Sequence, residues 1–264
     1  MSGNYCKELK NILSDKTSGS SGIVLKLNKY IASVAGSPER ISEAISAAGK
    51  NLSHFSAVNN YIAGLKKVLQ SYSAKKILEF TGSVASGIED RNAAIFTNAL
   101  KYIKGMNTFL TLSNSNILLD FFTRLGKGSG RLKIIVAESR PRLEGRIFAR
   151  RLLKCGIKAE LITDSMISLF IPKSSAVILG ADMILKDGSV VNKTGSRAAA
   201  MLAKRLGKPV FVIASKNKST KKRSYKPSKE NPSEVWMYKH KNLTVSNLYF
   251  EVIEKELITK IITD

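Results

Sequence analysis

Asp182 stands at the most chemically suggestive point of the sequence, just after the apolar run Ala176-Val-Ile-Leu179. Such a run predicts a buried strand, and a carboxylate beyond a strand end is well placed to move a substrate proton. The next acidic residue, Asp187, precedes a glycine, which is typical of a turn. The segment 180–196, GADMILKDGSVVNKTGS, is therefore a candidate active-site edge.

A possible anion site follows in the same segment, before a helix predicted to begin near Arg197. Its members are small or polar and stand close together: Asn192, Lys193, Gly195 and Ser196. The first N–H groups of a helix lack partners within the helix and carry partial positive charge, so a phosphate would bind there beside the lysine. The alternative is that Ser196 only caps the helix.

A second charged segment, AESRPRLEGR at residues 137–146, also follows an apolar run and precedes a predicted helix. Arginines can bind phosphate or carboxylate groups through two hydrogen bonds each. The residues that we assign to such a ligand are Arg140, Arg142 and Glu144. The alternative is internal pairing with the glutamates, although three arginines stand against only two acids.

Positive charge is the strongest feature of the composition, with 43 Lys and Arg against 20 Asp and Glu and a net charge of +23. Such a field attracts phosphorylated metabolites, acidic proteins or nucleic acid. The segment 215–229 has seven Lys or Arg and no acid. We predict a solvated loop in which Lys221, Lys222 and Arg223 contact an acidic or nucleic-acid partner. The alternative is that the charge only maintains solubility.

No segment predicts export or membrane insertion. Residues 1–15 lack the basic and apolar regions of a secretory signal, and no apolar run approaches the ~18 residues that span a bilayer. The two cysteines and two histidines lack metal-site spacing. We therefore expect a cytoplasmic protein without a metal or a cofactor.

Hydrophobic periodicity divides the chain between residues 104 and 105. Residues 1–104 repeat apolar positions at three- and four-residue steps, as in Ile23, Leu27 and Ile31, which predicts a helical domain with a loop at 81–87. Residues 105–264 alternate β-branched runs with amphipathic stretches, which predicts a Rossmann-like α/β domain, a parallel sheet with helices on both faces. Ligands of such sheets lie beyond the carboxyl ends of the strands. Residues 251–264 are predicted to form a helix, with a helix that runs into a short strand as the alternative.

Four segments together resemble a known superfamily. In chain order they are ESRPRLEGR, LITDSM, VILGADMILKDGSVVNKTGS and VSNLYFEVIEKELITKIITD. Their order and spacing are similar to the superfamily that unites the alpha, beta and delta subunits of translation initiation factor 2B with methylthioribose-1-phosphate isomerase and ribose-1,5-bisphosphate isomerase. The resemblance covers about residues 100–264. It implies a helical domain before a Rossmann-like domain, and assembly into dimers or larger rings.

The resemblance also implies roles for individual residues. The isomerases of the superfamily use a cysteine, the aspartate of a Gly-Ala-Asp motif and an asparagine-lysine pair. In this sequence the aspartate is Asp182, the pair is Asn192 and Lys193, and the cysteine position holds Ser113. An alcohol does not exchange protons near neutral pH as a tuned thiol does.

Two further departures concern the substrate pocket. Glu144 replaces a family glutamine, and the segment 14–23 lacks the arginine of the isomerases' substrate loop. The three changes favour a non-catalytic regulatory subunit that binds initiation factor 2 and retains a sugar-phosphate or nucleotide site. The alternative is an aldose-ketose sugar-phosphate isomerase, in which Asp182 carries the proton and Ser113 orients the substrate.

Overall fold

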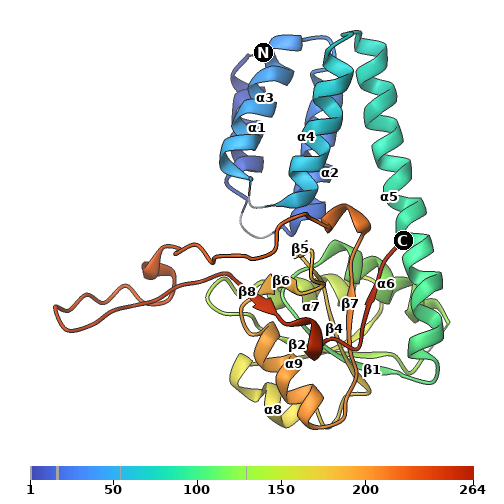
Figure 1. The fold of residues 1–264 in the computed structure, drawn as a ribbon, viewed down its shortest axis with the longest axis vertical. Helices are drawn as coiled ribbons and strands as arrows, with labels where there is room; N and C mark the ends of the chain where they lie inside the picture. Colours follow the sequence, from blue (N-terminus) through green and yellow to red (C-terminus); the bar gives the residue numbers. More distant parts are fainter. Residues whose placement is uncertain (1, 16–17, 54, 129) are drawn as a thin grey trace.

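A helical part and an α/β part make up the computed structural model, of which we describe residues 2–15, 18–53, 55–128 and 130–264, with side chains from residue 7 onward. The helices stand together above the sheet, and one long helix runs from the top of the helical part down the side of the α/β part (Figure 1). The segment 14–23, predicted to replace the substrate loop, is described only in part, because residues 16 and 17 lie outside these ranges.

The helical part packs one apolar face of each helix into a common core. Its elements are α1 (Ser2–Leu13), α2 (Ser20–Ser33), α3 (Pro38–Asn51), α4 (Ser56–Leu69) and the first half of α5 (Ala74–Ile103). In α2, Ile23, Leu27 and Ile31 follow the helical repeat and are almost fully buried. The predicted helical periodicity is therefore confirmed for this part of the chain.

The predicted loop at 81–87 is wrong, because these residues lie within α5. The hydroxyl groups of Thr81 and Ser83 donate to carbonyls three residues earlier, so the polar side chains bond to their own helix. The last turns of α5 bury Ile95, Ala99 and Ile103 against the sheet. The chain thus leaves the helical part on a helix that packs on both parts.

Six parallel strands form the main sheet, in the order β3-β2-β1-β4-β7-β9. The strands are β1 (Thr108–Leu112), β2 (Lys133–Ala137), β3 (Lys158–Ile162), β4 (Ala176–Leu179), β7 (Val210–Ile213) and β9 (Lys260–Ile262). Helices α5, α6 (Asn116–Lys127) and α7 (Glu144–Lys154) cover one face, and α8 (Ile167–Phe170) and α9 (Ser196–Arg205) cover the other. The predicted Rossmann-like arrangement is confirmed.

A small antiparallel sheet, β5 (Met183–Ile184), β6 (Val190–Lys193) and β8 (Phe250–Ile253), lies between the helical part and the main sheet. The predicted C-terminal helix is wrong: this segment forms β8, a single 3₁₀ turn and β9. Its run of β-branched residues pairs with the free edges of β6 and β7, and this pairing outweighs the helical spacing of its apolar residues.

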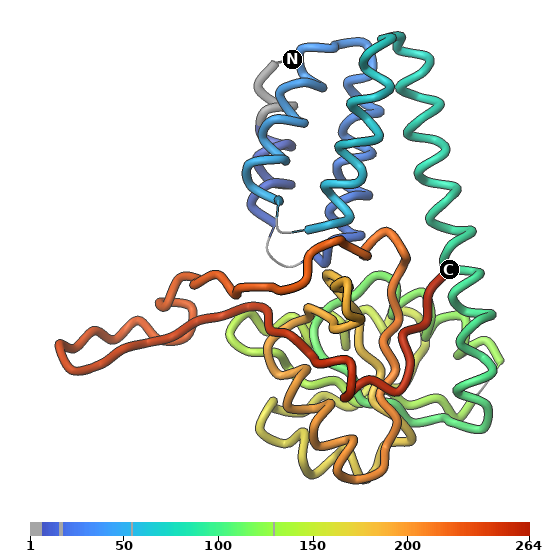
Figure 2. Tube along the Cα trace, viewed as in Figure 1, coloured from blue at the N-terminus to red at the C-terminus, as the bar shows by residue number. Residues whose placement is uncertain are grey.

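A long arm, which we define as residues 221–248, extends away from the body of the molecule (Figure 2). One backbone pair, Lys229 with Leu248, joins its two limbs near the base. No helix within the described ranges combines the length and apolar character needed to cross a bilayer.

Candidate active site at the ends of two parallel strands

The strand order places a crevice beyond the carboxyl ends of β1 and β4. From β1 the chain continues to β2 on one side, and from β4 it continues to β7 on the other, so the connecting segments part at this point. Ser113 follows β1 directly, and Asp182 follows β4. The two residues assigned to chemistry from the sequence therefore meet at the place where such sheets bind ligands.

A chamber of about 30 Å³ lies at this crevice. Its walls hold the side chains of Ser113, Glu144, Asp182, Asn192, Lys193 and Lys218, with Ser18 and Gly19 from the helical part. Asp182 and Lys193 also line a neighbouring cavity of about 270 Å³. A volume of 30 Å³ holds about two waters, so a ligand larger than this would lie mainly in the larger cavity, where it could still contact Asp182.

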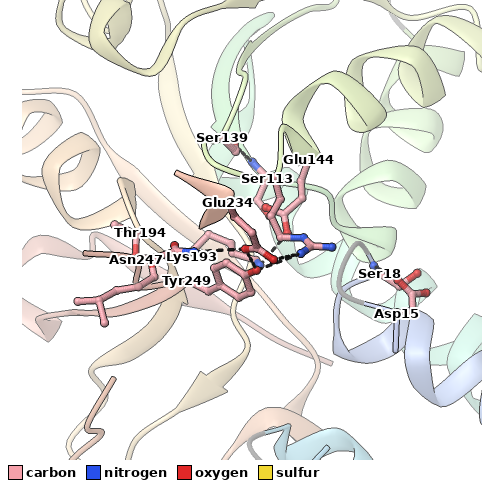
Figure 3. A network of polar contacts seen from close by, with 12 residues as sticks. Asp15, Ser18, Ser113, Ser139, Glu144, Lys193, Thr194, Glu234, Asn247 and Tyr249 are labelled. Atoms are coloured by element: carbon pink, nitrogen blue, oxygen red, sulfur yellow. Dashed lines mark hydrogen bonds and ion pairs between the residues drawn. The ribbon is translucent and has the colours of Figure 1, made fainter. Parts of the chain in front are cut away.

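Lys193 is held in a fixed position beside Glu144. Its Nζ lies 2.7 Å from Glu144 Oε1, and it also lies 4.9 Å and 4.5 Å from the ring centres of Tyr249 and Phe250. Figure 3 shows Glu144, Lys193 and Tyr249 gathered in one polar network. The lysine charge is thus directed at the chamber rather than at solvent.

Glu144 combines burial with a second carboxylate nearby. Only 4 % of the residue is exposed. Burial raises the pKa of Glu144, the charge of Asp182 raises it further, and the ion pair with Lys193 opposes both. Glu144 can therefore hold a proton at a pH at which an exposed glutamate is ionised, which suits a group that exchanges protons with a substrate.

Because the pKa of Glu144 is raised, we expect its contribution to the free energy of unfolding to decrease as the pH rises. The folded chain keeps this proton after the unfolded chain has lost it, so the folded state binds more protons just above the ordinary glutamate pKa of 4.5. The stabilisation is complete below that value and is lost as the pH rises through the folded-state pKa. We expect Glu144→Gln to remove this decrease when urea midpoints of both proteins are compared from pH 4.5 upward. Parallel midpoint curves would contradict the raised pKa.

Ser113 has an unusual backbone. Its φ is 68°, and Ser139 on the neighbouring strand end has a φ of 61°. The Ser139 hydroxyl accepts from the Ser113 N–H at 2.7 Å and donates to the Ala137 carbonyl at 3.1 Å. A left-handed conformation costs energy for a residue with a side chain. The buried Ser139 hydroxyl therefore stabilises the backbone conformation of Ser113 at the end of β1.

Ser139→Ala should therefore destabilise the protein by about 1–3 kcal/mol, because the buried Ser113 N–H loses its acceptor. Urea unfolding measures this cost. Ser83→Ala on the exposed side of α5 is a suitable control, since its hydroxyl bonds only within its own helix. Equal midpoints for the two variants would show that Ser139 does not hold the strand end.

The predicted anion site before α9 divides into two halves. Asn192 and Lys193 line the chamber, whereas Gly195 and Ser196 do not. The Glu251 carboxylate accepts from the N–H groups of Gly195 and Arg197 at 2.7 and 2.8 Å. An acidic side chain of the protein thus occupies the helix N-terminus.

The alternative prediction that Ser196 only caps α9 is wrong. The N-cap is Gly195, with a φ of 102°. The Ser196 hydroxyl is buried and accepts instead from Asn192 Nδ2 at 3.0 Å. This bond fixes the amide side chain of Asn192 at the chamber wall.

Arg140 and Arg142 point to the arm rather than to the chamber. Arg142 forms an ion pair with Glu234 at 2.6 Å and donates to the Tyr249 hydroxyl at 3.0 Å. Arg140 Nη2 donates to the Val235 carbonyl at 3.1 Å. Of the three residues assigned to a ligand in this segment, Glu144 alone lines the chamber.

Lys221, Lys222 and Arg223 lie exposed at the start of the arm. Lys222 contributes its carbonyl as acceptor for the N–H of Lys186. Their side chains stand away from the chamber, so any partner that they bind would contact a separate surface.

Lys218 is a charged chamber residue that the sequence analysis did not assign to the site. It is one of seven basic residues in 215–229, yet it is 5 % exposed and donates to the Ala181 carbonyl. The available signal was its position: it closely follows β7, the strand beside β4. Composition alone does not separate a buried lysine from six solvated neighbours.

The fold and this chamber define a two-part protein with a helical domain on a Rossmann-like sheet. The chain belongs to the Initiation factor 2 subunit family, which it matches over residues 13–264.

Curated relatives have two kinds of names. The chain is 34% identical to methylthioribose-1-phosphate isomerase of Fervidobacterium nodosum over 76% of its length and 61% of the enzyme. It is 31% identical to ribose 1,5-bisphosphate isomerase of Archaeoglobus fulgidus over 62% of its length and 54% of the enzyme. It is 30% identical to a putative translation initiation factor eIF-2B subunit 2-like protein of Pyrococcus horikoshii over 81% of its own length and 72% of that protein. The matches thus span about three fifths of the first enzyme and more of the factor-like protein.

Solved structures share the fold at low identity. Translation initiation factor eIF-2B from Pyrococcus horikoshii has a TM-score of 0.83 and 23% identity over 98% of this chain and 94% of that one. 5-Methylthioribose 1-phosphate isomerase from the same organism has a TM-score of 0.84 and 20% identity over 97% of this chain and 82% of that one. A chain of the tetrameric eIF2B-beta2-delta2 complex of C. thermophilum has a TM-score of 0.78 and 17% identity over 98% of this chain and 90% of that one. The relatives as a set favour the isomerase alternative over the non-catalytic hypothesis.

Proposed function

We propose that the protein interconverts the aldose and ketose forms of a phosphorylated sugar. The observation that carries this proposal is the pair of carboxylates, Asp182 and buried Glu144, in one chamber with Lys193. The similarity to two kinds of sugar-phosphate isomerase supports it. Ribose 1,5-bisphosphate and methylthioribose 1-phosphate are accordingly the substrates to test.

Each residue has a distinct part in the proposed reaction. In a sugar 1-phosphate the isomerisation breaks the ring bond between C1 and O4, moves a hydrogen from C2 to C1, and transfers a proton from the C2 hydroxyl to O4. Asp182, which lines both cavities, takes the proton from C2 and returns it to C1. Protonated Glu144 supplies a proton to O4 and regains one from the C2 hydroxyl. Lys193 stabilises the negative charge that develops on that oxygen or binds the phosphate. In this scheme Glu144 supplies the proton transfer for which the family uses a thiol, and Ser113 orients the substrate.

The test is direct. The purified chain is incubated with each substrate, and the products are followed by NMR. The proposal predicts a ketose phosphate from at least one of them at a rate proportional to protein concentration. Failure of both substrates, each at millimolar concentration, would reject the proposed activity.

A second candidate is a non-catalytic subunit that binds initiation factor 2, as a homodimer or within a larger ring. The specific observation in its favour is Ser113 at the thiol position, together with the pairing of Lys193 by Glu144, which neutralises a cation that a phosphate would need. Similarity to the factor-like protein adds support. In this case Lys221, Lys222 and Arg223 would contact an acidic surface of the factor or RNA.

Binding experiments separate this candidate from the first. Immobilised protein should retain purified initiation factor 2, and reversal of the three charges to glutamate should release it. RNA affinity that falls steeply with salt and with the same charge reversal would instead identify nucleic acid as the partner. Absence of both interactions would leave the isomerase as the supported function.

A further inference from the structure

A third cavity, of about 370 Å³, shares Lys218 with the candidate chamber. Helices α2, α4 and α5 form one wall, and α6 with the turn at 215–218 forms the other. Asn60 Nδ2 on α4 donates to the Asn217 carbonyl at 2.7 Å, so the two walls are joined directly. The volume falls within the range of about 300–1,000 Å³ that is usual for small-molecule sites.

The lining combines an apolar body with polar groups at its edges. The apolar side chains are Val24, Leu25, Phe80, Val84, Ile88 and Ile117. Two cations, Arg91 and Lys218, belong to the lining, and no acidic residue does within the part of the chain that the structure describes. The cavity therefore favours a ligand that is partly apolar and negatively charged.

Lys218 is buried, and the one carboxylate that acts on its charge among the described residues is that of Asp182. Its ammonium donates to the backbone carbonyl of Ala181. Burial lowers the pKa of Lys218, and the charge of Asp182 opposes this shift. A buried amine held by a single carbonyl is costly for a protein unless a negative group also contacts it.

Tyr61 gives a second, independent indication. It lines the cavity, and its hydroxyl is buried and has no hydrogen-bond partner among the described residues. Buried polar groups in folded proteins nearly always have a partner, so this wall of the cavity keeps an unsatisfied polar group.

We propose that this cavity binds a small amphipathic anion, with an aromatic or aliphatic body against Phe80 and Val84 and a carboxylate, sulfonate or phosphate between Lys218 and Arg91. The site is distinct from the candidate substrate chamber, although Ser21, Asn116 and Lys218 line both. Its occupant contacts both domains.

The probe for this site is 8-anilinonaphthalene-1-sulfonate, whose fluorescence rises when its rings leave water. We expect saturable binding of one probe per chain in 150 mM salt. Val84→Trp fills the cavity without altering any charge, and Arg91→Met removes one cation. Each should weaken binding at least tenfold. The matched control Arg205→Met changes an exposed residue at the end of α9 and should leave binding unchanged.

Unaltered binding to Val84→Trp, with the variant shown to be folded by its circular dichroism, would overturn the proposal, because the probe would then lie elsewhere. Equal losses in Arg91→Met and Arg205→Met would also overturn it, since they would indicate general attraction to a basic surface. The uncharged analogue N-phenyl-1-naphthylamine should bind at least tenfold more weakly. The probe titration uses no sugar substrate, so its failure and a failed isomerase assay are separate results.

Discussion

Asp182→Asn is expected to lower kcat for sugar-phosphate isomerisation by a factor of about 10²–10⁴, the usual contribution of a positioned general base. Asparagine keeps the size of the side chain and removes its basic oxygen. KM should change little, because binding depends on Lys193 and the larger cavity. Steady-state kinetics by NMR or a coupled assay measures both quantities.

The control for this variant is Asp90→Asn, at an exposed position on α5. It makes the same chemical change and alters the net charge equally. Equal rates for Asp182→Asn and the wild type would remove Asp182 from the mechanism. A large loss in both variants would indicate that charge or folding, rather than chemistry, determines the rate.

Gly145→Ala is expected to be the most destabilising small substitution in the chain. An added Cβ would lie 1.9 Å from the Ala137 carbonyl oxygen and 2.9 Å from the Glu138 Cα. Both are backbone atoms at the end of β2, so no side-chain rotation can relieve the clash. Helix α7 would have to move away from the sheet. We expect a loss of about 4 kcal/mol or more of unfolding free energy, measured by urea denaturation.

Gly82→Ala is the matched control. An added Cβ meets nothing within 4 Å at this helical position, and alanine should stabilise the helix by up to about 1 kcal/mol. Similar unfolding midpoints for the two variants would show that the close approach at Gly145 can relax. The approach matters for the site because Gly145 adjoins Glu144 and so sets where that carboxylate enters the chamber.

Much of the α/β part could be predicted because its signals are local. The β-branched runs at 108–112 and 176–179 form central strands as expected, and the parallel order then brings Ser113 and Asp182 together. The predicted C-terminal helix failed because pairing with β6 and β7 is a long-range effect. The predicted loop at 81–87 failed because polar residues in α5 bond to their own helix.

The chamber residues that the sequence predicted are Ser113, Glu144, Asp182, Asn192 and Lys193. The prediction failed for contacts between distant parts of the sequence. Arg142 follows β2 at a distance, and its partner Glu234 lies 92 residues away in the sequence. Glu251 reaches the start of α9 across a similarly long separation. No spacing rule connects such pairs. Charge counting in 137–146 therefore suggested a ligand for arginines that in the structure hold the arm.

Glu144 is the residue on which the functional proposal depends. The resemblance stated in the sequence analysis implies a family glutamine at this position, and burial raises the pKa of Glu144, so that it can hold a proton. If it has taken over proton transfer from the thiol, restoring the family residue alone should inactivate the enzyme. Restoring both residues, in Ser113→Cys with Glu144→Gln, should recover activity by the family route.

The most direct measurement is the rate of ketose phosphate formation, followed by NMR, for the wild type, Glu144→Gln and the Ser113→Cys/Glu144→Gln double variant. We predict turnover by the wild type, a loss of at least a hundredfold in the single variant, and recovery in the double variant. Turnover by Glu144→Gln at the wild-type rate would contradict proton transfer by this carboxyl group.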